Sequence, residues 1–299
     1  MLRTVSMKVL APVSFEGVPP ERVVTLPNVE NFDLIVNDGG PGYEIAAHIS
    51  CPSAKVTSLV HKKDIDYTMP DEIFPTSVSW NAIVRQYTRS SVEEVTIEIK
   101  TALLITCKLT FRYADATIIE LCFEVVDEDN FGFYLPSEEI QDELLTQSVR
   151  TVQNHPQLPN VKRLHVCHSF RALCSVKPSH IAGEIGRLLV SVGPLDELTI
   201  YRCDLRPYFD PFPIFPEDYI DEPVVFPQIK EFTISHPECS SDEQCKATIV
   251  GLAKSQHTLG VPFERVVIRR ESMPPGMEEG LRPWVGSVEY CYEQRCESR

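Results

Sequence analysis

The chain has 299 residues and a formal net charge of −15, with 43% apolar and 24% charged residues. This composition is typical of a globular protein and excludes the collagen-like and disordered classes. The low pI of about 5.0 and the lack of a basic block argue against nucleic acid and anionic membrane surfaces as partners. No stretch approaches the ~18 apolar residues of a membrane-spanning helix.

The ten cysteines are scattered along the chain and include no C-x-x-C pair. Several alternate with apolar residues, as in Leu121-Cys122-Phe123, which is typical of strand residues that face a core. We therefore expect reduced thiols and a protein of a reducing compartment, either cytoplasmic or nuclear.

In the first half, an apolar-x-x-apolar-x-apolar phrase predicts short strands centred on Val5, Phe32, Val95 and Leu121, with a poor copy around Thr57. A weak helical pattern covers residues 76–89. A stronger one covers residues 137–155, where apolar residues recur on one stripe at Ile140, Leu144, Leu145 and Val152.

In the second half the same phrase is regular. Its central residues, Leu164, Leu198, Phe232 and Val266, are each 34 residues apart, and a last copy is centred on Val288. Helices are predicted over residues 178–192 and from a capping box, Ser240 to Glu243, to just before Gly260.

Alternating strands and helices predict an α/β protein with a parallel sheet, in which each unit stacks on the next. We expect a single domain over residues 1–299. It is less regular over 1–135, has 34-residue repeats over 156–270, and ends with a unit over 271–299.

One copy fills the leucine-rich-repeat signature L-x-x-L-x-L-x-x-N/C-x-L with Leu195, Leu198, Ile200, Cys203 and Leu205. Val29, Phe32, Leu34 and Asn37 fill it as far as the Asn. Cys203 and Asn37 are therefore expected to bond backbone groups where their strands end. Ser169, Pro237 and Glu271 occupy the equivalent place in other copies.

The chain resembles the leucine-rich-repeat part of fungal F-box-type proteins. The segments that carry the resemblance are residues 26–35, 79–83, 114–117, 158–166, 251–254 and 263–269. The resemblance implies an irregular leucine-rich-repeat solenoid, with parallel strands on the concave face and helices and loops on the convex face. It also implies a substrate receptor of a cullin-type ubiquitin ligase.

In that family an F-box ahead of the repeats binds the ligase adaptor. The sequence shows no such module before the strand around Val5, so we expect a truncated gene model or a lost F-box. Binding to the adaptor is expected only if an F-box lies upstream.

Three kinds of chemical site were considered: a phosphate-binding loop, a zinc site and a nucleophile motif. The loop Asn37 to Gly42 lacks the Gly-Lys-Ser/Thr of a phosphate-binding loop and shows no helix start after it, so it predicts a turn. His165, Cys167 and His168, with Cys174 and His180 downstream, do not form the two short-spaced pairs that zinc prefers. No Gly-x-Ser-x-Gly nucleophile motif occurs.

The sequence therefore predicts no catalytic, cofactor-binding or metal-binding residue and no enzyme activity. The favoured function is a non-catalytic protein-recognition module for an unknown protein partner. Two alternatives remain: a small hydrolase or transferase that uses a Cys/His site, and a truncated fragment with no independent function.

If the repeats stack, the non-core strand positions form one continuous concave surface, acidic near its middle and basic around Arg265 and Arg269. The expected partner-binding residues on it are Glu94, Glu98, Arg163, His165, Glu197, Tyr201, Glu231, Arg265 and Arg269. The aromatic, proline-rich stretch 208–220 either covers the convex side of the core or is an exposed anchor for a partner.

Overall fold

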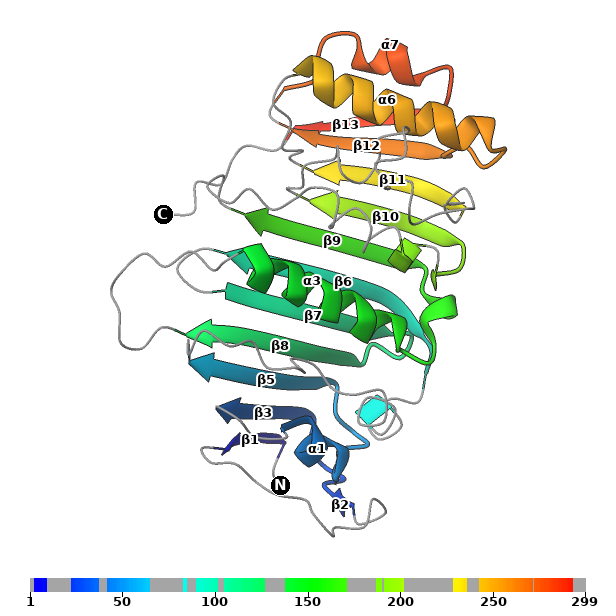
Figure 1. The fold of residues 1–299 in the computed structure, drawn as a ribbon. Coiled ribbons are helices and arrows are strands. Elements are labelled where there is room, and N and C mark those ends of the chain that lie inside the picture. Colours follow the sequence, from blue (N-terminus) through cyan, green and yellow to red (C-terminus); the bar gives the residue numbers. More distant parts are fainter. Residues whose placement is uncertain are drawn as a thin grey trace. The chain divides into compact units, whose positions relative to one another are not determined.

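The structure is a computed structural model, shown as a ribbon in Figure 1. It describes residues 3–9, 23–37, 42–64, 83–84, 90–101, 105–126, 138–170, 187–189, 191–201, 228–235, 242–270 and 272–292. The chain forms two compact units. Unit 1 contains residues 1–160 and 170–175, and unit 2 contains residues 161–169 and 176–299.

Among the described residues of unit 2, parallel strands follow one another in chain order. They are β9 (Arg163–Phe170), β10 (Leu195–Tyr201), β11 (Ile229–Ser235), β12 (Arg265–Arg270) and β13 (Ser287–Tyr292). The predicted strand centres lie opposite one another in the sheet, in the order Leu164, Leu198, Phe232, Val266 and Val288. Residues 34 positions apart thus pair in adjacent strands from β9 to β12, which confirms the predicted alignment.

Parallel neighbours need a crossover between them. In unit 2, α6 (Asp242–Thr258) connects β11 to β12, and α7 (Met277–Leu281) connects β12 to β13. α6 carries Asp242 and Glu243 in its first turn and is followed by Gly260, whose φ of 79° is left-handed. This is the predicted helix, with the acidic start and the glycine end that its sequence indicates.

α6 packs through a stripe of buried residues spaced three and four apart. They are Cys245, Ile249, Leu252 and Ala253. Its first turn is joined to the end of β12 by Arg270, whose Nη1 lies 3.0 Å from Asp242 Oδ1. Figure 1 shows α7 beside α6. Phe232 and Phe263, both buried, stack with ring centroids 5.2 Å apart.

The main strands of unit 1 are hydrogen-bonded in the order β1-β3-β5-β8-β7-β6. The first four are parallel: β1 (Thr4–Val9), β3 (Asn31–Asn37), β5 (Val56–Asp64) and β8 (Ile118–Val126). Val5 pairs with Phe32 and Phe32 with Thr57, as the sequence predicts. A small parallel pair, β2 (Val24–Thr25) and β4 (Ile49–Ser50), lies beside this sheet.

Two predictions for unit 1 are wrong in detail. Thr57 pairs with Ile119, so the predicted centre Leu121 is two residues late and pairs with Leu59 instead. The short helix α1 (Gly42–Ala47) directly follows the glycine-rich loop, where the sequence showed no helix start.

The remaining strands of unit 1 are antiparallel. β6 (Val92–Thr101), β7 (Ile105–Tyr113) and β8 form a meander in which Val95 pairs with Phe111 and Phe111 with Ile119. The sequence predicted parallel strands here and missed β7. The connections are too short for a crossover, and the β7–β8 turn contains Ala116 at φ 65°, so the chain must reverse.

The helix α3 (Glu138–Gln153) lies along β6 and β7 (Figure 1) and agrees with the predicted 137–155. Val149 and Val152 of this helix are fully buried, whereas the side chains of Ile140, Leu144 and Leu145 lie outside the described residues. Two predicted helices are described only in part: Ile83 and Val84 of 76–89, and Leu188 and Leu189 of 178–192, are helical and buried. The stretch 208–220 and Cys203 also lie outside the described residues.

The protein is therefore a mixed α/β structure with mostly parallel strands, as the sequence predicts at this coarse level. In strands such as β6 and β10, alternate residues are buried, as expected for strands with one face toward a core. The largest fully buried side chains include Phe32, Phe111, Phe123, Phe232 and Phe263. Leucine-rich-repeat character stays a prediction.

Candidate functional site

The non-core face of the unit 2 sheet carries polar side chains in register. In the first row Arg163 pairs with Glu197, Glu197 with Glu231, and Glu231 with Arg265. We call these four residues the charged row. Because neighbouring strands lie ~4.8 Å apart, the row presents its charges at a fixed spacing.

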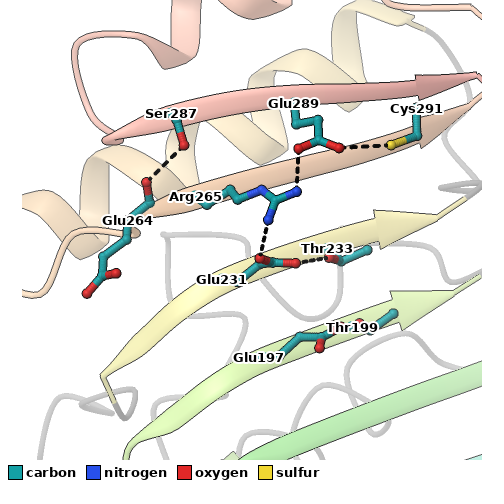
Figure 2. Close-up of polar contacts among 9 residues, drawn as sticks. All are labelled: Glu197, Thr199, Glu231, Thr233, Glu264, Arg265, Ser287, Glu289 and Cys291. Carbon is teal, nitrogen blue, oxygen red and sulfur yellow. Dashed lines mark hydrogen bonds and ion pairs between the residues drawn. The ribbon is translucent and has the colours of Figure 1, made fainter.

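Arg265 is the centre of the contacts on this face (Figure 2). Its Nη1 donates to Glu231 Oε2 at 3.0 Å, and its Nη2 donates to Glu289 of β13. The hydrogen bond from Arg265, followed by one from Cys291, lowers the pKa of Glu289. Arg265 is thus already engaged by two carboxylates, and the predicted basic end of the surface is partly neutralised.

Threonine hydroxyls orient the two central carboxylates of the charged row. Thr199 donates to Glu197 at 2.8 Å and Thr233 donates to Glu231 at 3.4 Å (Figure 2). Glu197 and Glu231 are direct cross-strand partners of like charge, an unfavourable arrangement. Arg265 compensates Glu231. Within the described residues, no Lys or Arg nitrogen lies within 4.0 Å of Glu197.

The row behind the charged row is less accessible. It runs from His165 through Thr199 and Thr233 to Val267, and Thr233 and Val267 are 0% and 1% exposed. In the third row, Tyr201 and Arg269 flank Ser235, which is 1% exposed. The accessible part of the predicted surface in unit 2 is therefore the charged row together with half-buried His165, Tyr201 and Arg269.

At the starts of the strands a further ion pair flanks the charged row. Lys230 Nζ lies 2.6 Å from Asp196 Oδ1, and this hydrogen bond lowers the pKa of Asp196 and raises that of Lys230. Both side chains are about half exposed.

The non-core face of unit 1 is a network of ion pairs. Glu94 pairs with Arg112 at 3.0 Å, Glu98 with Lys100 at 2.7 Å, Glu120 with Lys108 at 2.8 Å, and Glu124 with Lys62 at 2.7 Å. The sequence predicted Glu94 and Glu98 as part of an acidic surface but missed the cations. Lys108 and Arg112 belong to β7, whose alternation of apolar and polar residues was the available signal.

The nine predicted partner-binding residues therefore fall in two groups. Glu94 and Glu98 lie in unit 1, where each is paired with a cation. The structure brings Arg163, Glu197, Glu231 and Arg265 together in unit 2, with His165, Tyr201 and Arg269 in the rows behind them. The sequence missed Glu289, which extends the charged row through Arg265.

The described cysteines carry thiols and not disulfides: Cys51, Cys107, Cys122, Cys167, Cys245 and Cys291. Burial raises the pKa of Cys51 to about 11 and that of Cys107 and Cys122 to about 12. Since the thiolate is the nucleophile, these three thiols are neutral and unreactive near pH 7.

Cys107 instead shares a hydrogen bond of 2.9 Å with Ser148, which joins β7 to α3. Among the described residues, no three His, Cys, Asp or Glu side chains are grouped to hold a metal ion. Cys174 and His180 lie outside the described residues.

Comparison with known protein families, curated proteins and solved structures finds no match to the chain. In the part of the chain that the structure describes, no helix combines the length and the apolar character needed to cross a membrane. The structure is thus a mixed α/β protein with mostly parallel strands. On one face of its second unit, charged side chains of successive strands lie in register.

Proposed function

We propose that the chain is a non-catalytic protein-recognition module that binds a protein partner through the charged row of unit 2. The observation that carries the proposal is the register of this row, in which four charged side chains from successive strands lie side by side on an accessible face. Sheets of repeated strands use such faces to bind partners, and fixed charges mainly set specificity and orientation.

The partner is expected to place a lysine or arginine beside Glu197. Glu231 already has Arg265, whereas Glu197 accepts a hydrogen bond from Thr199 and has no described cation within ion-pair distance. A cation between Glu197 and Glu231 would relieve the repulsion between the two carboxylates.

The resemblance to the repeat part of fungal F-box-type proteins extends this proposal. By that resemblance the partner is a substrate of a cullin-type ubiquitin ligase, in the cytoplasm or nucleus. The adaptor of the ligase would bind only a longer chain that carries an F-box.

The test is quantitative affinity purification of the full chain from cells, with charge reversal at the face. Glu197→Lys and Arg269→Glu alter half-buried residues of the predicted surface. Glu279→Lys on α7 is the control matched to Glu197→Lys, because it makes the same charge change at an exposed position elsewhere in unit 2. We expect a defined partner to be lost at least tenfold with both face variants and retained with the control.

All variants must show the circular dichroism spectrum and melting temperature of the wild type. If the Glu197→Lys and Arg269→Glu variants fold and still capture the same partners as the wild type does, the proposal is overturned. Co-purification of the ligase adaptor is a separate readout, which tests the family role without testing the face.

A further inference from the structure

His155 lies at the junction of α3, β7 and the short 3-10 helix η1 (Leu158–Asn160), and it is 2% exposed. Its ring stacks on Phe111, with centroids 5.2 Å apart and planes at 18°. Its Nε2 lies 2.9 Å from Tyr113 Oη, and its Nδ1 lies 3.1 Å from the backbone N of Gln157. Both ring nitrogens thus have hydrogen-bond partners in unit 1.

These contacts fix the protonation state of the ring. A backbone N–H can only donate, so Nδ1 must accept the hydrogen bond from Gln157 and must lack a proton. The proton of the neutral imidazole is then on Nε2, which donates to Tyr113 Oη.

Gln157 continues the network to β6. Its side-chain Oε1 accepts a hydrogen bond of 2.9 Å from the backbone N–H of Val92, the first residue of that strand. The register between β6 and β7 shifts between Val92 and Glu94, so the cross-strand ladder is irregular here. The ring of His155 and the side chain of Gln157 therefore connect the end of α3 to the start of β6 and the end of β7.

A second proton on the ring is incompatible with this arrangement. It would turn Nδ1 into a donor that faces the N–H of Gln157, and that hydrogen bond would be lost. Burial also disfavours the charged form and lowers the pKa of His155 to about 4.

Few ionisable groups surround the ring in the described part of unit 1. Tyr113 contacts it directly from β7, while β6 presents the main chain of Val92. The nearby charged groups are engaged or exposed elsewhere: Arg112 with Glu94, Asp115 with the Thr117 backbone in the β7–β8 turn, and exposed Arg150 on α3.

We infer that His155 is a proton-sensitive latch: its neutral ring holds the end of α3 and η1 against β6 and β7, and protonation releases them. The latch acts within unit 1 and is independent of the proposed recognition surface.

The test is amide hydrogen exchange of the full chain between pH 8 and pH 5, corrected for the intrinsic exchange rates. If an opened segment exposes an ordinary histidine, the opening equilibrium of residues 146–160 should rise roughly thirtyfold over this range. α6 of unit 2 provides the internal reference and should change much less. An equal change in both helices would contradict the latch.

Two variants separate the latch from a general acid effect. His155→Phe keeps an aromatic ring on Phe111 but cannot titrate, so the pH response of residues 146–160 should disappear. His257→Gln, at an exposed position on α6, should keep it. A pH response that persists in folded His155→Phe would overturn the inference.

If His155→Phe does not fold, nitrogen NMR of the wild-type ring decides. We expect the Nε2–H tautomer and a midpoint far below 6.5. The Nδ1–H tautomer, or a midpoint near 6.5, would rule out the latch.

Discussion

At the scale of single residues, the described charges on the non-core faces of the two units are largely compensated by neighbours on the same face. Among the ion pairs described above for unit 1, the pair of Lys108 and Glu120 is well shielded, with side chains 33% and 27% exposed. Lys108 also lies directly opposite Glu98 on β6. It therefore lies between two carboxylates that belong to the strands on either side of β7.

Replacing Lys108 with Met should lower the free energy of unfolding by about 1 kcal/mol, since one half-buried carboxylate loses its counter-charge. Lys100→Met is the control, because Lys100 is more exposed, and it should cost clearly less. Urea denaturation at low and high salt measures both, and the difference should shrink in high salt. Equal costs for the two variants would contradict this account.

Sequence reasoning found the glutamates of this network but not its lysines and arginines. Glu94 and Glu98 belong to a strand that repeats the apolar phrase. Lys108 and Arg112 belong to β7, which does not fall at the spacing of the repeated strands. The alternation of Cys107, Leu109 and Phe111 with polar residues would have identified β7. Which carboxylate pairs with which cation depends on cross-strand register, which the sequence does not state.

His155 makes unit 1 sensitive to acid. Its pKa is about 4 in the folded protein and about 6.5 in the unfolded chain, so between these values the unfolded chain binds more protons. The free energy of unfolding should be fully retained above pH 6.5 and should fall by about 3 kcal/mol as the pH drops to 4. Equilibrium urea denaturation at stepwise pH measures this loss. If the wild type and His155→Phe lost stability in parallel as the pH falls, the loss could not be assigned to His155.

At the scale of elements, glycines define where α6 ends and where β13 begins. Gly260 has a φ of 79°, and a Cβ there would meet nothing within 4 Å. Gly286 precedes β13, and a Cβ there would lie 2.6 Å from the backbone oxygen of Glu264. Gly260 is required for its left-handed backbone conformation, whereas Gly286 is required because there is no space for a Cβ.

Gly260→Ala should therefore cost about 1 kcal/mol, and Gly260→Asn less, because Asn tolerates the left-handed region. Gly286→Ala should cost more than either, since backbone must move to admit the methyl group. Thermal and urea denaturation of the three variants give the order. A Gly286→Ala variant as stable as the wild type would contradict the close approach.

Whether an element could be predicted from the sequence depended on how it is connected to the next one. β11, α6 and β12 could be predicted because a capping box, an apolar stripe and a glycine mark one helix between two strands of equal spacing. The β6–β8 meander could not be predicted as a repeat, because its turns reverse the chain, whereas a repeat of strand and crossover keeps its strands parallel. The two-residue error at Leu121 has the same origin, since period-two alternation fits either Ile119 or Leu121.

At the scale of the whole molecule, the 34-residue spacing acts as a structural unit in the second half of the chain. Leu195 and Ile229 are equivalent positions, paired in adjacent strands. Removing residues 195–228 would join Pro194 to Ile229 and so place β11 beside β9 with the register kept.

We expect this deletion variant to fold, with parallel-sheet circular dichroism and a smaller denaturant m-value. Removing only residues 212–228, half of the unit, should prevent folding or cause strong destabilisation, because the connection between β10 and β11 is shortened without removing a strand. Urea denaturation compares the two. Equal stability of both deletions would show that the spacing is not a unit of structure.

The central claim, that the charged row is the recognition surface, is tested most directly by site-specific photo-crosslinking in cells. A photoreactive phenylalanine analogue would replace Tyr201, which lies four residues after Glu197 on the same face of β10. The same analogue at Glu279 on α7 serves as the control position. We predict a discrete crosslinked partner from position 201 that is lost when Glu197→Lys is added, and no such product from position 279. Equal crosslinking from both positions, or a partner that survives Glu197→Lys, would contradict the account.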